Sequence, residues 1–265
     1  MNLTLFAHEL RSNAALFGIF FCVLTMYIGV VTGMFDPSLG DSLNALAASM
    51  PELFAAFGMG SQATTLADFM MNYLYGFLLT VIPFVLILML VNRMVVQRIE
   101  RGTMACLLAT PVSRLRIAAS MVGALVAMLL AMLALTAAAG LVFAELFFPG
   151  ELDVARLMQA HAGLLGLWLF LAGICTLSAC ALPAGGPALW VGGGIGVGLF
   201  LLQMGGQIGG APEILSDVNP LNLYDPFALA SGETSAIAGA VALGVCGIVL
   251  LVAAIVTFTR RNLSV

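Results

Sequence analysis

Six long apolar runs, separated by short polar segments, dominate the pattern of this chain. A helix needs about 20 consecutive apolar residues to cross the hydrocarbon core of a bilayer, and each run is close to that length. The pattern therefore predicts an all-α, polytopic membrane protein that forms a single transmembrane domain over residues 1–265. The predicted spans are residues 14–34, 72–92, 117–143, 162–182, 188–204 and 236–258.

The charged residues between these runs are distributed unevenly. Six spans place both termini on one side, and eight of the nine basic residues then share that side, leaving only Arg156 opposite, among most of the acidic residues. Cytoplasmic loops are enriched in arginine and lysine. We therefore expect a multi-pass protein of the inner or plasma membrane with both termini in the cytoplasm. The eight residues are Arg11, Arg93, Arg98, Arg101, Arg114, Arg116, Arg260 and Arg261.

Composition narrows the function classes. The chain is 62% hydrophobic and 8% charged, whereas soluble domains are about 45–50% apolar and about 25% charged. This excludes a soluble domain and a nucleic-acid binder with a basic face. All nine basic residues are arginine, so the chain has no lysine for a Walker A nucleotide site. We predict no enzyme activity, no catalytic residue, no metal site and no cofactor in this chain.

The predicted spans carry no Asp, Glu, Arg or Lys near their middles. Ion-coupled carriers usually keep an ionisable group at that depth to bind the coupling ion. The energy for transport is therefore expected to come from outside this chain. A secondary carrier or channel, and a membrane scaffold that does not transport, remain as alternatives to a transporter that is driven from outside this chain.

The polar segments contain three further patterns. Leu3, Phe6 and Leu10 fall at helical spacing opposite His8, Glu9 and Arg11, which predicts a short amphipathic helix on the cytoplasmic surface before the first span. A simple flanking tail is the alternative. Residues 36–70 show an apolar stripe that favours one or two interfacial helices, and the Gly- and Pro-rich stretch 205–235 is expected to be a loop with a short helix.

The loop between the second and third spans is the most informative. Gly102-Thr103 is a signal for one helix to end and another to begin, and Thr110-Pro111 is expected to start the helix of the third span. Between them the sequence predicts a short helix over residues 103–109. Its apolar face carries Met104, Leu107 and Leu108. This helix is too short to span, so it either docks a cytoplasmic partner or rests on membrane lipid.

This loop resembles a known signature. The run Glu100-Arg101-Gly102-Thr103, then Leu107-Leu108, then Thr110-Pro111-Val112-Ser113-Arg114 is similar to the pattern between the second and third spans of permeases of the type-2 class of ABC exporters. The six-span layout extends the resemblance over most of the chain. The lysine that usually follows this pattern is absent, and Ser120 or a neighbour stands in its place.

The resemblance implies an assembly. The chain would pair with a second permease, identical or homologous, and with two separate ABC ATPase subunits that bind ATP and Mg. Residues 100–110 would be the coupling helix, seated in a groove of the ATPase, with ion pairs from Glu100 and Arg101 and buried contacts from Met104, Leu107 and Leu108. The candidate docking residues are Glu100, Arg101, Gly102, Thr103, Met104, Leu107, Leu108, Pro111 and Arg114.

The fifth span contains two pairs of glycines spaced four residues apart, Gly192 with Gly196 and Gly194 with Gly198. This spacing is typical of close contacts between membrane helices. The glycines either pack helices within one subunit or contribute to the seam between two permeases, for which the resemblance implies the first and fifth spans.

Overall fold

The computed structural model describes residues 2–35, 49–51, 65–108, 111–183, 186–207 and 219–261. The regular structure of these residues is helical throughout, and six of the helical segments are long and apolar enough to cross a membrane. The predicted fold class is therefore confirmed. The six segments are α1 (Leu3–Gly33), Leu66–Glu100, α8 (Arg114–Phe147), α9 (Val154–Ala181), α10 (Gly186–Gln207) and α13 (Thr234–Arg260).

The second span is divided by two π-helical turns, whereas the hydropathy pattern predicts a single helix. The helix α5 (Leu78–Val91) is its central part. Pro83 lies inside α5, so the Leu79 carbonyl loses the N–H that would normally bond to it from four residues later. Trp168 Nε1 of α9 donates to this carbonyl over 2.9 Å. The remaining parts are α4 (Leu66–Met70), η2 (Met71–Tyr75), η3 (Asn92–Val96) and α6 (Gln97–Glu100).

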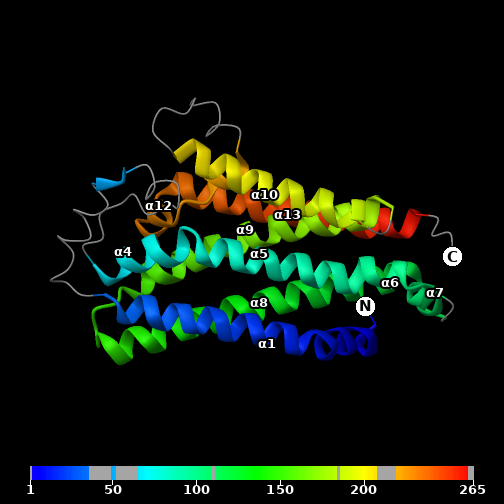
Figure 1. Ribbon diagram of the computed structural model, residues 1–265, viewed down its shortest axis with the longest axis horizontal. Helices are drawn as coiled ribbons and strands as arrows, with labels where there is room; N and C mark the ends of the chain where they lie inside the picture. Colours follow the sequence, from blue (N-terminus) through cyan, green and yellow to red (C-terminus); the bar gives the residue numbers. More distant parts are fainter. Residues whose placement is uncertain are drawn as a thin grey trace.

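The helix α9 forms the centre of the bundle. In its most apolar window 78% of the residues are buried, compared with 17% in the corresponding windows of α1 and α10. It packs most extensively on α13 and also contacts α5, α8 and α10, while α1 packs mainly on α8. Figure 1 shows α1 and α10 at opposite sides of the bundle, with α5 between them. These two helices therefore bury the smallest share of their apolar windows within the chain.

The two ends of the bundle differ. Both termini lie at one end together with α6 and α7 (Thr103–Leu108), and α4 and α12 (Pro226–Ala230) lie at the other (Figure 1). This arrangement agrees with the predicted even number of crossings. With η4 (Pro220–Leu223), the helix α12 also confirms short helical structure within the stretch 205–235.

Glycines set the close approach of α9 and α13. A β-carbon at Gly247 would lie 2.5 Å from the Leu169 carbonyl carbon and the Phe170 amide nitrogen, which is far inside van der Waals contact. A β-carbon at Gly166 would overlap the Ala240 carbonyl oxygen. Only glycine allows the two backbones to meet in this way, as small residues do in other membrane helix pairs.

The four glycines of the fifth span divide into two groups. A β-carbon at Gly192 would overlap Ser178 of α9, and one at Gly196 would overlap the Phe84 ring of α5. At Gly194 and Gly198 such a β-carbon would meet no atom of another described helix within 4 Å. The first pair therefore packs within the subunit, as one of the two interpretations predicts, and the second pair faces outward.

Two predicted helix boundaries are wrong. The N-terminal segment is not a separate interfacial helix, because α1 runs without a break for 31 residues. The third span begins at Arg114, with Ser113 at the N-cap position, so Pro111 precedes the helix and does not occupy its first turn. The interfacial helices expected over 36–70 fall mainly in 36–48 and 52–64, outside the described residues.

Candidate functional site at the arginine-rich end of the bundle

A turn over residues 100–103, called the elbow below, joins the second span to α7. The helix α6 ends at Glu100, and Gly102 follows with φ of +69°, in the left-handed region that favours glycine. Thr103 then begins α7, and its Oγ1 donates to the Arg98 carbonyl oxygen over 3.3 Å. The predicted short helix is therefore present, as Thr103–Leu108, and the Gly102-Thr103 pair is its start signal.

The helix α7 is held against its own chain. Met104 is 2% exposed and belongs to the hydrophobic core, and the half-buried Leu107 packs against the same core. The expectation that Met104 would contact a partner is therefore wrong, because its side chain already contacts this chain. The Leu108 side chain lies outside the described structure. The exposed surface of the elbow consists of Glu100, Arg101, Gly102 and Thr103, with Pro111 and Arg114 exposed nearby.

A buried ion pair joins α1 to this elbow. Arg98 donates to both carboxylate oxygens of Glu9, through Nη1 to Oε1 and through Nη2 to Oε2, the latter over 2.9 Å. The Glu9 side chain has no exposed surface, and the Arg98 side chain is 16% exposed. The sequence pattern placed Glu9 on an exposed polar face, which is wrong because Arg98, distant in sequence, supplies its partner. Such a two-pronged pair is among the strongest polar contacts in proteins.

Glu100 and Arg101 differ from this pair. Within the part of the chain that the structure describes, neither forms an ion pair with another residue. Their exposed charges are available for the ion pairs that the resemblance implies.

Hydrogen bonds to backbone groups connect the helix ends around the elbow. The N-terminus of α1 is bound to α8, because the backbone N–H of Asn2 donates to Ser120 Oγ over 2.7 Å, and Ser120 Oγ donates to the Arg116 carbonyl over 2.7 Å. Ser120 is thus a buried link between helices. The other links are Arg93 to the Ser12 carbonyl at 3.4 Å, Arg114 to the Arg261 carbonyl at 3.0 Å, and Arg261 to the Cys180 carbonyl at 3.2 Å.

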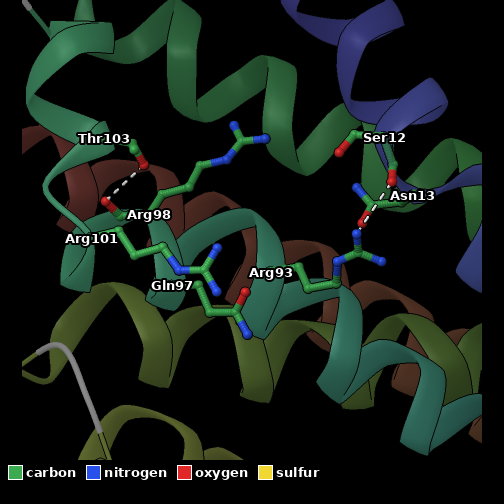
Figure 2. A pocket seen from close by; sticks show the side chains of 7 residues that line it. All are labelled: Ser12, Asn13, Arg93, Gln97, Arg98, Arg101 and Thr103. Atoms are coloured by element: carbon green, nitrogen blue, oxygen red, sulfur yellow. Dashed lines mark hydrogen bonds between the residues drawn. The ribbon is translucent and has the colours of Figure 1, made fainter.

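A polar cavity of about 220 Å³ opens between α1 and the elbow (Figure 2). Arg93 and Arg101 reach into this region from the second span, with Gln97 between them, while Ser12 and Asn13 contribute from α1. The charge pattern of the sequence predicts these arginines on one side of the membrane but does not predict that they converge. The lining residues are Ser12, Asn13, Arg93, Gln97, Arg98, Arg101 and Thr103.

A second buried polar cluster lies toward the opposite end and was missed in the sequence. The Tyr75 hydroxyl contacts His161 Nδ1, and Thr136 Oγ1 lies 3.5 Å from His161 Nε2. The three residues come from η2, α8 and α9 and are all buried. A lone histidine about two turns into an apolar helix was the available signal. The described residues contain no group of three metal-ligating side chains that could hold a metal ion.

One comparison with known proteins gives a match. The family described as "Multidrug efflux system permease Rv1217c, C-terminal domain" matches residues 4–259, which is nearly the whole chain. A search of curated proteins finds no match to this sequence.

Proposed function

Because this chain belongs to the family of the multidrug efflux system permease Rv1217c, C-terminal domain, we propose that it is the membrane subunit of an ATP-driven exporter of the type-2 ABC class. The family and the six apolar helices identify a membrane-embedded transport permease. The ABC mechanism, the export direction and the partners are the proposed part, and they rest on the elbow and on its resemblance to the coupling segment of that class.

The observation that carries the proposal is the way α7 is fixed to the bundle. Buried Met104 holds the short helix against the core, while Glu100, Arg101 and Thr103 face outward at the end where both termini lie. A partner that binds this surface can displace α7 as a rigid body. Since Arg98 at the base of the elbow is paired with Glu9 of α1, the same motion reaches the first span. Rigid-body movement of packed helices is a common form of such transitions.

The partner in this proposal is a pair of cytoplasmic ABC ATPase subunits that bind ATP and Mg. This sequence has no lysine, so it holds no Walker A site, and in this proposal the ATPase subunits supply the energy. In this arrangement the arginine-rich end faces the cytoplasm, in agreement with the positive-inside rule, and the chain resides in the inner or plasma membrane.

A second permease, identical or homologous, completes the proposed pathway. The helices α1 and α10 bury the smallest share of their apolar windows within the chain. On α10, Gly194 and Gly198 leave open space above the backbone, where another helix can approach closely. We place the seam between the two permeases on these surfaces, with the substrate path between the subunits.

The proposal is tested by purifying the tagged chain gently from its native membrane and measuring ATP hydrolysis of the preparation. We expect an ATPase subunit to co-purify, and we expect Glu100→Arg on the exposed elbow to abolish the hydrolysis that accompanies the wild type. Glu151→Arg is the matched control, because it makes the same charge reversal at an exposed site in the loop between α8 and α9. If no ATPase accompanies the wild-type chain, the ABC mechanism is wrong and a secondary carrier is the better interpretation.

A further inference from the structure

We propose that the cavity between α1 and the elbow binds the phosphate group of an anionic ligand, and that an anionic phospholipid of the membrane supplies it. Guanidinium groups around this polar cavity would recognise the phosphate. The cavity lies at the level where the apolar surface of the second span ends. The cavity shares Arg101 and Thr103 with the exposed elbow, so binding is measured on the chain without any ATPase, which keeps this proposal independent of the proposed ATPase contact.

The charge balance of the cavity is positive. Among the seven described residues that line it, three are arginines and none is Asp or Glu. Glu9 neutralises Arg98 by the buried pair, so the charges of Arg93 and Arg101 remain. Arg93 uses one N–H group on the Ser12 carbonyl, and a guanidinium has five. Planar guanidinium groups match the geometry of phosphate oxygens.

The space is large enough for such a group. A single water molecule requires roughly 10–15 Å³ of cavity, and this cavity measures about 220 Å³. Gln97 and Thr103 add neutral hydrogen-bonding groups to its wall. Glu100 is exposed and is not among the described residues that line the cavity.

The surface next to the cavity indicates why the phosphate would belong to a lipid. One face of the second span carries residues at intervals of four, namely Val85, Met89, Arg93 and Gln97, and Arg101 follows directly after the end of α6. Val85 and Met89 are each 41% exposed. The stripe is thus apolar along α5 and becomes polar and basic along η3 and α6. An amphiphile with its headgroup at Arg93 and Arg101 would lay an acyl chain over Met89 and Val85.

The same boundary appears on the facing helix. Ser12 and Asn13 line the cavity, and the predicted first span begins directly after them, at residue 14. Two helices therefore change from polar to apolar at the cavity, as expected at the headgroup level of a bilayer. Basic pockets between membrane helices on the cytoplasmic side are recognised binding sites for anionic headgroups.

The test measures binding of phosphatidylglycerol to the purified full-length chain in detergent by native mass spectrometry, without any ATPase. Phosphatidylcholine, which has the same phosphate but no net charge, is measured in parallel. Each arginine near a membrane surface contributes about fivefold to anionic lipid binding. We expect Arg93→Gln or Arg101→Gln to raise the Kd for phosphatidylglycerol about fivefold, and the two together about 25-fold.

Arg260→Gln is the matched control, because Arg260 is an exposed arginine at the same end of the bundle and does not line the cavity. We expect this control to leave the Kd within about twofold of the wild type. The pair Arg93→Lys and Arg101→Lys keeps both charges and is expected to restore most of the binding that the glutamine pair loses. If the glutamine pair weakens binding no more than Arg260→Gln, or if the lysine pair restores nothing, the site is wrong.

Competition by inorganic phosphate shows whether the bound phosphate group belongs to a phospholipid or to free phosphate. If the chain binds a phospholipid, inorganic phosphate competes weakly, because it has no acyl chain to lie over Met89 and Val85. Strong competition that is lost in the glutamine pair supports a phosphate site but overturns the lipid as its occupant.

Discussion

The Glu9–Arg98 pair gives the sharpest test of the fold at the functional end. Replacing Arg98 by Met leaves the Glu9 carboxylate without a partner at a position with no exposed surface. Removing one partner of a buried pair costs about 3–5 kcal/mol. Glu9→Leu is expected to cost less, because Arg98 retains 16% exposure and its long side chain can turn toward water. The double variant Glu9→Leu, Arg98→Met removes both charges, and its cost is expected to be near zero.

The assay is thermal unfolding of the purified chain, with the four proteins of this double-mutant cycle compared in one detergent. For chains of this size 1 kcal/mol corresponds to about 2–4 °C in Tm, so Arg98→Met is expected to lower Tm by about 10 °C. The matched control is Arg156→Met, which breaks the partly exposed Arg156–Asp68 pair, with N and O 3.4 Å apart, and is expected to cost less than about 1 kcal/mol. Equal losses for the two arginine variants, or a double variant that loses the sum of its single variants, would refute a buried, coupled pair.

Three further predictions follow from the helix contacts. Trp168→Phe is expected to lower the free energy of unfolding by about 1–3 kcal/mol, because it leaves the Leu79 carbonyl buried without a donor. In a Pro83→Ala background this loss is expected to be smaller, since residue 83 regains its N–H. Equal losses in both backgrounds, measured by thermal unfolding, would contradict the hydrogen bond from Trp168 to Leu79. Gly247→Ala is expected to lower Tm strongly, because its β-carbon would lie 2.5 Å from backbone atoms of α9. Gly194→Ala lies in open space and is expected to leave Tm unchanged or to raise it, because alanine adds up to about 1 kcal/mol of helix propensity to the free energy of unfolding. Gly194→Leu with Gly198→Leu is expected to reduce the dimer fraction measured by chemical cross-linking in membranes, while Val245→Leu on the exposed face of α13 leaves it unchanged; an unchanged fraction in both would remove the seam from α10.

Much of the fold could be predicted because a bilayer imposes a simple requirement on each segment. The backbone of a spanning segment satisfies its own hydrogen bonds only as a helix, so hydropathy alone finds the six helices. It does not find the π-helical turns η2 and η3 that divide the second span. The start of α8 was placed at Pro111 for a local reason, the preference of proline for a first turn, and the described helix begins at Arg114.

The local structure of the elbow was predicted from the sequence, whereas its contacts within the chain were predicted only partly. Gly102 and the short helix after it are local signals, and the structure contains both. The orientation of α7 is not local, because an apolar side chain such as Met104 fits a partner's groove or its own core equally well by sequence. Glu9 illustrates the same limit, since helical spacing assigns a charged residue to the exposed face unless its partner is known.

The buried pair also explains why the first helix is continuous. An amphipathic helix lies flat on a membrane when its charged face needs water, and Glu9 is the residue that would require water. Arg98 supplies that need from the second span, so Glu9 can be buried while His8 and Arg11 stay exposed, and the helix can continue into the bilayer. The loss of this pair in Arg98→Met should therefore destabilise the start of α1 more than the rest of the bundle. Hydrogen exchange of residues 3–13 is expected to rise in that variant while exchange in α9 stays low, and uniform changes in both helices would contradict this local role.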